Sequence, residues 1–238
     1  MDKLIISLDE THHLMNGNPL YTRRFDQVQS FHFPLGFAPV KKARHAFFIN
    51  QNGERVFNRN FKEAFGFYDG IATVVDEKGF FHIDEQGQDI HSQRFAWSGN
   101  FQEGICAVED MASKQFFHIN RSGEPIYTER YSYVGDFRYG IAVVTGKDSL
   151  CTHIDEFGNL LHEKYFLELD VYHKSYAIAK DAKGYFHIDK EGYALYHDRY
   201  IKLEPYYNGR ALAVDQGNIK IIISTTGEVI RILSRLNK

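Results

Sequence analysis

The sequence predicts an all-β protein built from repeats of about 35 residues, and three observations support this fold class. Seven glycines recur with successive spacings of 36, 34, 36, 35, 34 and 35 residues. Between them lie short runs rich in Val, Ile, Phe and Tyr, separated by turn residues such as Asn52-Gly53 and Lys78-Gly79, and this composition is typical of strands. No segment repeats apolar residues at helical spacing over three turns, so we expect essentially no long helix. The seven glycines are Gly17, Gly53, Gly87, Gly123, Gly158, Gly192 and Gly227.

Each repeat is defined by three landmarks. The repeated glycine opens the first, as in Gly87-Gln-Asp-Ile-His-Ser-Gln-Arg-Phe95. A second reads Gly-x-Ala-x-Val or close to it, as in Gly70-Ile-Ala-Thr-Val74, and a third precedes the glycine, as in Phe80-Phe-His-Ile-Asp84. Each unit therefore has up to four short antiparallel strands, which matches a propeller blade. We predict a single closed β-propeller over residues 1–238.

The number of blades depends on how the two ends of the repeat array are counted. Leu4-Ile-Ile-Ser-Leu8 resembles the degraded start of a unit, and Ile219 to Leu233 repeats the second half of one. Counting them separately gives seven blades, which we favour. The alternative is six blades, with the N-terminal piece completing the last one. In both cases we expect Ile219 to Leu233 to close the ring against N-terminal strands, because closure removes exposed sheet edges.

The small residue in the second landmark predicts close packing of sheets. It is Ala38, Ala72, Cys106, Ala142, Ala177 or Ala211. We therefore interpret Cys106 as a small buried residue and not as a reactive thiol.

Composition excludes several classes of protein. The chain has 28 Lys+Arg against 31 Asp+Glu, a net charge of −3, and lacks the basic excess expected of a nucleic-acid binder. Its apolar runs are too short to span a bilayer, and Met1 to Glu10 do not resemble a signal peptide. Two cysteines are too few for a disulfide scaffold. We expect a cytoplasmic protein without a membrane or nucleic-acid partner.

The repeat resembles that of WG-repeat proteins. The WG unit has a Gly-Leu-Ala-x-Val strand, a Trp-Gly-x-Ile-Asp-x-x-Gly segment and a Lys-Tyr-Asp-type linker. Here Ile-Asp and the following glycine persist, whereas Phe80-Phe81, Phe116-Phe117, Tyr185-Phe186 and Cys151-Thr152 replace Trp-Gly. The resemblance extends along nearly the whole chain. It implies a bacterial β-propeller-like interaction module, often joined to another domain, with no family-wide catalytic residues to transfer.

Repeated polar residues are interpreted as structural. His82, His118, His153 and His187 occupy equivalent positions, and neighbouring packed sheets lie about 10 Å apart, too far for shared metal ligation. We assign no role to the terminal pair His12-His13. The repeated cations are expected to pair with the carboxylates that close the third landmark, as latches that fix the register of a blade. The cations are Arg24, Arg94, Arg130, Lys164 and Arg199, and the carboxylates are Asp84, Asp155 and Asp189.

Residues that depart from the repeat are better candidates for binding. Trp97, the only tryptophan, lies two residues after the linker aromatic Phe95, where other units have Gln27, Glu63, Tyr133, Leu167 and Lys202. Trp97 and Tyr133 occupy the same position of consecutive units, so a closed ring would place them on one face of adjacent blades. Such a pair suits a sugar ring. The alternative is that Trp97 fills a gap between blades.

We expect a noncatalytic binding module that recognises a protein or glycan partner on one propeller face. The sequence has no nucleophile elbow, phosphate-binding glycine loop or His-Glu-x-x-His motif, and we predict no catalytic residue, metal or cofactor. The first alternative is an N-terminal substrate-recruiting module of a larger enzyme, such as a transferase. The second, ranked lower, is a propeller hydrolase that uses channel carboxylates. We expect a monomer unless another domain is joined to it.

Overall fold

The structure is a computed structural model that describes residues 3–235, and the described chain is all-β. It divides into two compact units, Met1–Pro125 and Ile126–Lys238, called here the N-terminal and C-terminal units and described separately. Within the described residues no helix is long and apolar enough to cross a membrane. The all-β prediction is confirmed, because every regular element of the described residues is a strand.

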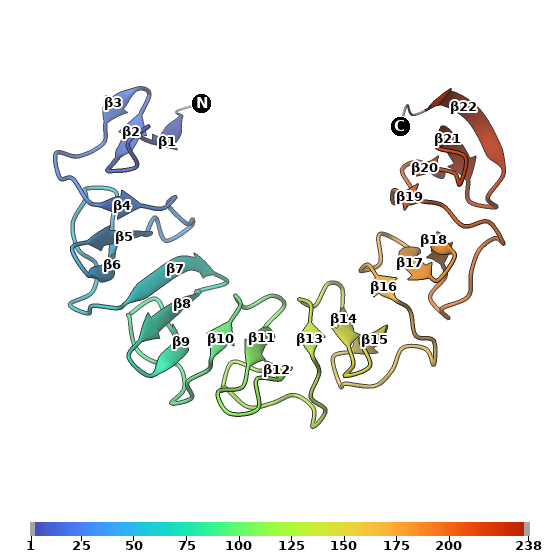
Figure 1. The fold of residues 1–238 in the computed structure, drawn as a ribbon. Coiled ribbons are helices and arrows are strands. Elements are labelled where there is room, and N and C mark those ends of the chain that lie inside the picture. The colour runs from blue at the N-terminus through green and yellow to red at the C-terminus, as the bar shows by residue number, and fades with distance from the viewer. Residues whose placement is uncertain (1–2, 236–238) are drawn as a thin grey trace. The chain divides into compact units, whose positions relative to one another are not determined.

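The N-terminal unit contains four antiparallel three-stranded sheets (Figure 1). Their strands are β1 (Leu4–Ile6), β2 (His13–Met15) and β3 (Asn18–Pro19); β4 (Gln27–Val28), β5 (Ala38–Lys42) and β6 (His45–Ile49); β7 (Glu63–Tyr68), β8 (Ile71–Asp76) and β9 (Gly79–Ile83); and β10 (Trp97–Ser98), β11 (Cys106–Glu109) and β12 (Phe116–Ile119).

The C-terminal unit contains two further three-stranded sheets and one four-stranded sheet. Their strands are β13 (Tyr133–Val134), β14 (Ile141–Thr145) and β15 (Cys151–Asp155); β16 (Glu168–Leu169), β17 (Ala177–Asp181) and β18 (Gly184–Ile188); and β19 (Lys202–Leu203), β20 (Arg210–Val214), β21 (Ile219–Ser224) and β22 (Val229–Arg235).

Strand pairing gives seven separate sheets over residues 3–235, which agrees with the seven-unit count. In each sheet, strands pair with their neighbours in chain order. The N-terminal piece forms its own sheet, in which β1 pairs with β2, while Ile219 to Leu233 fall in β21 and β22, which pair with each other. The N-terminal piece therefore has a sheet of its own, as the seven-blade count requires. The closed ring stays a prediction.

The repeated glycine is required by the turn after the third strand. Gly87 has φ +75°, and an added Cβ would lie 2.7 Å from the Phe57 ring. Gly158 has φ +81° and lies equally close to Tyr127. Because a side chain would be strained by the backbone and would also collide with an aromatic ring, only glycine fits. Positive φ is common to all seven repeated glycines, including Gly17, where an added Cβ would meet no atom within 4 Å. The turn conformation therefore explains the period seen in the sequence.

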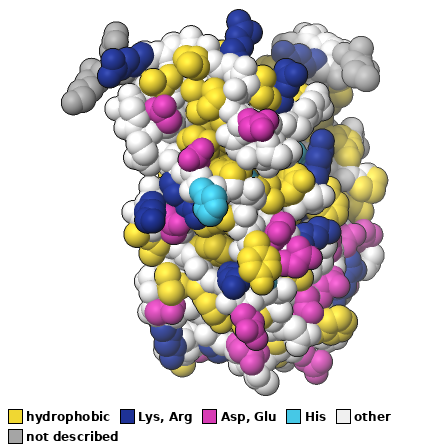
Figure 2. Space-filling model, turned by 90° about the vertical axis from the view of Figure 1, so that its right-hand side faces the viewer, with side chains coloured by type: hydrophobic (Ala, Val, Ile, Leu, Met, Phe, Trp, Pro, Cys, Tyr) yellow, Lys and Arg dark blue, Asp and Glu magenta, His cyan; other side chains and the backbone are white. Residues whose placement is uncertain are grey.

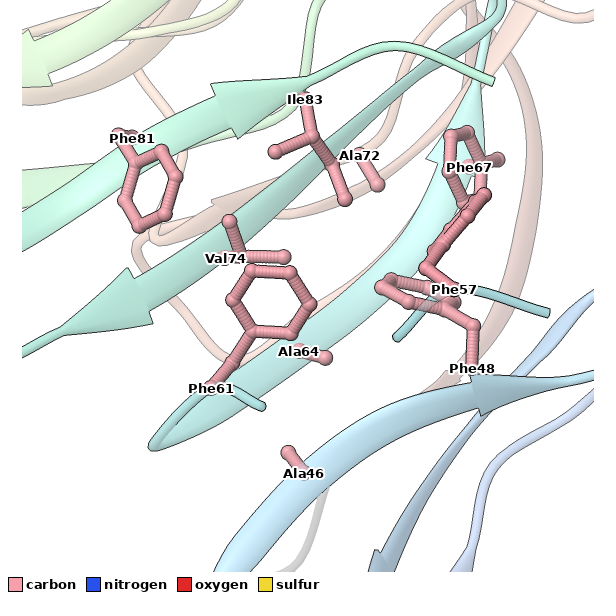
Figure 3. Packing of buried hydrophobic residues seen from close by; sticks show 10 residues of the cluster. All are labelled: Ala46, Phe48, Phe57, Phe61, Ala64, Phe67, Ala72, Val74, Phe81 and Ile83. Atoms are coloured by element: carbon pink, nitrogen blue, oxygen red, sulfur yellow. The ribbon is translucent and has the colours of Figure 1, made fainter. Parts of the chain in front are cut away.

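Facing sheets pack through alanines that lie opposite phenylalanines. Figure 3 shows the cluster between sheets β4–β6 and β7–β9, where Phe48 and Phe67 have ring centroids 5.0 Å apart. Ala46 and Ala72 in this cluster are almost completely buried. The repeated small residue is buried in all six units that carry it, Cys106 included, so its predicted role in close packing is confirmed.

The predicted cation–carboxylate latch exists in two sheets but uses a different carboxylate. Arg199 Nε lies 2.7 Å from Asp181 Oδ2, and Arg94 Nε lies 3.0 Å from Asp76 Oδ2. Asp76 and Asp181 end the second strand of their sheets. The prediction that named Asp84, Asp155 and Asp189 was wrong for these pairs, because those carboxylates accept backbone N–H bonds in the glycine turn, as Asp84 does from Gln86 and Gln88.

Each latch arginine also closes the loop that precedes it. Arg199 donates to the carbonyl oxygens of Tyr196, His197 and Asp198, and its guanidinium lies 3.6 Å from the centroid of the Phe186 ring. Arg24 and Arg130 donate to the three preceding carbonyls in the same way. Pairing of Arg130 with a carboxylate stays a prediction.

Lys164 was placed in this series by a register error of one residue. The linker aromatic of its unit is Phe166, which is buried and bridges to Cys151, whereas Tyr165 is exposed. Lys164 therefore lies two positions before the aromatic, where Gln93 lies in another unit, and is not equivalent to the latch arginines.

We predict that Arg199→Ala lowers the free energy of unfolding by about 2 kcal/mol, because it removes several charge-assisted hydrogen bonds from a mostly buried side chain. Arg199→Lys should recover less than half of this loss, because an ammonium cannot bond Asp181 and three carbonyls together. Urea denaturation measures both, with exposed Lys190→Ala as the control. An Arg199→Ala loss no larger than that of the control would contradict the latch.

Candidate functional site

A buried histidine joins successive sheets, and its geometry is seen most completely at His187. Its Nε2 lies 3.1 Å from the carbonyl oxygen of Glu204 and its Nδ1 lies 2.6 Å from the hydroxyl of Tyr196. A carbonyl only accepts, so Nε2 donates and Nδ1 accepts from the tyrosine. The imidazole also stacks on Tyr206, with ring centroids 3.9 Å apart. Because Glu204 and Tyr206 lie in the segment that connects β19 to β20, His187 links its own sheet to the next one.

The same arrangement recurs in both units, and we call it the histidine brace. His153 lies 3.0 Å from the Asp170 carbonyl oxygen and pairs with His162. His13 lies 2.9 Å from the Gln29 carbonyl oxygen and pairs with Tyr21. His82 contacts the Ser98 hydroxyl and pairs with His91. The partners Tyr21, His91, His162 and Tyr196 all lie four residues after a repeated glycine.

The structural interpretation of these histidines is confirmed, with one correction. His82, His118, His153 and His187 are all buried. No three His, Cys, Asp or Glu side chains among residues 3–235 are grouped as metal ligands. His13 was wrongly passed over as part of a terminal pair, although it is the brace of the first sheet. Its turn is one residue shorter than the others, which shifts it relative to the glycine and hides the equivalence.

The braces of the C-terminal unit position a cleft between sheets β16–β18 and β19–β22. The cleft has a volume of about 720 Å³, within the range of ligand sites. Its apolar wall includes Ile178 and Leu212, and its polar side chains are Glu168, Asp170, Tyr185, Lys202, Glu204 and Lys220. Asp170 and Glu204 are the residues whose carbonyls accept from His153 and His187. The buried imidazoles therefore anchor the backbone that bears two cleft carboxylates.

Charges in the cleft are partly compensated. Glu168 pairs with Lys180 and accepts a 2.7 Å hydrogen bond from the Tyr185 hydroxyl, and these two contacts lower the pKa of its carboxyl. Burial, followed by repulsion from Glu168, raises the pKa of Asp170. Lys202 and Lys220 bring positive charge to the same cleft. A ligand here therefore meets acceptors and donors together.

The two residues predicted from the sequence lie at the expected strand position but not in this cleft. Trp97 begins β10 and is 41% exposed, and Tyr133 begins β13 and is 55% exposed. They belong to different units. Trp97 packs on Phe116 of its own sheet, with ring centroids 6.0 Å apart. Their role in binding stays a prediction.

Sequence reasoning nevertheless selected the strand position that lines the cleft. The equivalents of Trp97 in sheets β16–β18 and β19–β22 are Glu168 and Lys202, because each begins its sheet and pairs with the second strand. The predicted equivalence of Lys202 is therefore confirmed, whereas that of Leu167 is wrong by one residue, as for Lys164, and belongs to Glu168. Charged side chains at this strand position are the sequence signal for the cleft.

Comparison with known families agrees with the repeat. Residues 47–78 and 119–150 match the family model described as WG containing repeat. These two segments are therefore similar to WG containing repeats. Among curated proteins, none matches the sequence.

Solved structures similar to this chain have low sequence identity to it. A eukaryotic initiation factor aligns at 12% identity with a TM-score of 0.60, over 98% of this chain and 73% of that one. BamB from Moraxella catarrhalis aligns at 11% identity with a TM-score of 0.50, over 97% and 84%. The WD40 β-propeller domain of Doa1 aligns at 12% identity with a TM-score of 0.38, over 98% and 78%. At these identities the likeness concerns the fold alone, which is that of a β-propeller.

We predict that His187→Ala lowers the free energy of unfolding by about 2–4 kcal/mol, because it opens a cavity and leaves the Tyr196 hydroxyl and Glu204 carbonyl without their partner. Tyr193→Ala, at an exposed site in the same repeat, should change it by less than about 0.5 kcal/mol. Chemical denaturation measures both. Equal losses would show that the brace adds nothing to stability.

The braces also predict acid lability. Burial, which disfavours the imidazolium, lowers the pKa of His82 to about 3 and those of His153 and His187 to about 4, against 6.5 without burial. Unfolding therefore takes up protons, so this stability is complete above pH 6.5 and is lost as pH falls from 6.5 toward 4, at about 1 kcal/mol per pH unit for each histidine. Urea titrations at stepped pH test this. A free energy of unfolding that does not change between pH 7 and 5 would contradict this prediction. The variant His187→Gln should make the dependence of that free energy on pH less steep by about 1 kcal/mol per pH unit.

Proposed function

We propose that this chain is a noncatalytic binding module whose cleft between sheets β16–β18 and β19–β22 holds a neutral oligosaccharide. The observation that carries the proposal is the mixture of groups in the cleft. Carboxylates accept hydrogen bonds, ammonium groups donate them, and Tyr185 and the aliphatic wall supply flat apolar contact. Sugar hydroxyls both donate and accept, and sugar rings have apolar faces, so a saccharide matches every component.

A charged peptide fits this cleft less well. Three carboxylates and two lysines line the cleft together. An acidic peptide would therefore be repelled by the carboxylates and a basic peptide by the lysines, and repulsion between like charges is costly where water is excluded. The face in Figure 2 has the same mixed character, with acidic, basic and hydrophobic side chains interspersed. A substrate-recruiting module of a larger enzyme would use the same cleft, and the reading frame after Lys238 distinguishes it from a self-standing module.

A hydrolase is the second candidate, favoured by one observation. Glu168 and Asp170 are two residues apart in the cleft, and their pKa values are shifted in opposite directions. Pairs of carboxyls with such divergent environments divide acid and base roles in glycosidases. Release of reducing sugar from a bound oligosaccharide would favour this candidate over the noncatalytic module.

We predict that thermal-shift screening with neutral di- to hexasaccharides will find ligands, and that Glu204→Gln and Lys202→Met will each weaken their binding by about tenfold, or about 1.4 kcal/mol. Isothermal titration calorimetry measures the affinities. Glu129→Gln, at an exposed site in the same unit, is the matched control and should bind as the unmodified chain does. Saccharide binding that is indifferent to both cleft variants, or binding of charged peptides alone, would contradict the proposal.

A further inference from the structure

The outer edge of the last sheet differs from those of other sheets. After the third strand of a typical sheet, the chain returns along it and forms isolated bridges instead of a regular strand, such as Ile83–Asp89 and Phe80–Phe95 beside β9. Irregular outer segments of this kind protect a sheet from unwanted pairing. In the last sheet the equivalent segment is β22, a regular strand of seven residues paired with β21.

β22 is exposed along its whole length. All seven residues, Val229–Arg235, are exposed, and Ile232 reaches 68%. Val229, Ile230 and Leu233 add to the same apolar surface. Among the described residues β22 is the last strand of its sheet, with β21 on one side only. Two register shifts interrupt the β21–β22 pairing, but the strand still presents a row of main-chain donors and acceptors outward.

The charge of this edge indicates its partner. β22 carries Arg231 and Arg235, and β21 adds Lys220, whereas neither strand contains Asp or Glu. A second copy of the chain, paired edge to edge, would bring four arginines together at one junction. An acidic segment would instead meet opposite charges, which favours its approach and orientation.

We propose that β22 is a docking edge for an extended segment of a partner protein in which aliphatic and acidic residues alternate, and which adds to the sheet as a fifth strand. Main-chain hydrogen bonds supply affinity in this mode, and alternate side chains supply specificity. The register shifts place Arg231, paired with Ile222, and Arg235, paired with Ile219, on opposite faces of the sheet. One face of the added strand covers Val229 and Ile232, and the carboxylates on its other face reach Arg231. The proposal does not depend on the saccharide cleft, because Lys220 is the one residue of β21 or β22 that lines the cleft.

The test uses a fluorescent peptide of about nine residues in which valine and glutamate alternate. We expect saturable binding by fluorescence anisotropy that weakens as salt is raised. The matching valine–lysine peptide should not bind, nor should a valine–glutamate peptide with two central prolines, because proline removes ladder donors. Binding of the proline peptide with equal affinity would overturn strand addition.

Charge reversal locates the site. The double variant Arg231→Glu/Arg235→Glu should lose affinity for the valine–glutamate peptide by on the order of tenfold or more and gain binding of the valine–lysine peptide. Arg44→Glu/Lys114→Glu changes net charge equally at exposed sites of the N-terminal unit and should bind as the unmodified chain does. If both double variants lost affinity for the valine–glutamate peptide equally, the loss would reflect net charge alone, and the proposal would be overturned.

Hydrogen exchange on the unmodified chain provides a readout that does not depend on how the variants fold. Peptide binding should slow exchange of amides within Val229–Arg235, and a neutral oligosaccharide should leave those amides unchanged. Protection confined to other strands, protection of β22 in a self-associated state without peptide, or pairing of β22 with the chain's own N-terminal strand would each overturn the proposal. Loss of saccharide binding alone would leave it standing.

Discussion

The buried neutral histidine between successive sheets is the interaction on which most of this structure depends. Each sheet is small, with first strands often only two residues long, and cannot bury an apolar face alone. At His187 one imidazole joins a tyrosine of its own repeat, a carbonyl of the next sheet and an aromatic ring of that sheet. The neutral imidazole therefore packs successive sheets together and holds the backbone of the cleft. Because it is neutral only above its pKa, it also makes stability depend on acid.

The period and the strand content were predictable because they reflect local constraints. A glycine with positive φ that also touches an aromatic ring cannot be replaced, so Gly87 and Gly158 mark the repeat reliably. Burial of the Phe-His-Ile histidines was predictable from repetition, since equivalent side chains in successive sheets cannot share a metal ion. The seven-sheet count followed from the same spacing, once each end of the chain was treated as a separate unit.

The site was only partly predictable, because its features are not local. The partner of Arg199 is a carboxylate 18 residues earlier across a hairpin, and several repeated carboxylates satisfied the sequence pattern equally well. Taking Tyr165 in place of Phe166 as the linker aromatic displaced Lys164 and Glu168 together, because neighbouring strand residues point to opposite faces. The cleft arises where two particular sheets leave space between them, and no residue type signals that space. The exposed edge of β22 was likewise visible only once its strand neighbours were known.

One junction in the N-terminal unit has no histidine at the brace position. Between sheets β4–β6 and β7–β9, Phe48 occupies the brace position, packs on Phe57 and Phe67 and has no group that titrates. The junctions at His13 and His82, on either side of this pair of sheets, lose their support when the imidazoles take up protons. Acid should therefore act on this junction through His32, whose ring lies 4.9 Å from that of Tyr68 and whose pKa is lowered by burial. It should not act through the brace position, where Phe48 replaces the histidine and Phe57 replaces its partner.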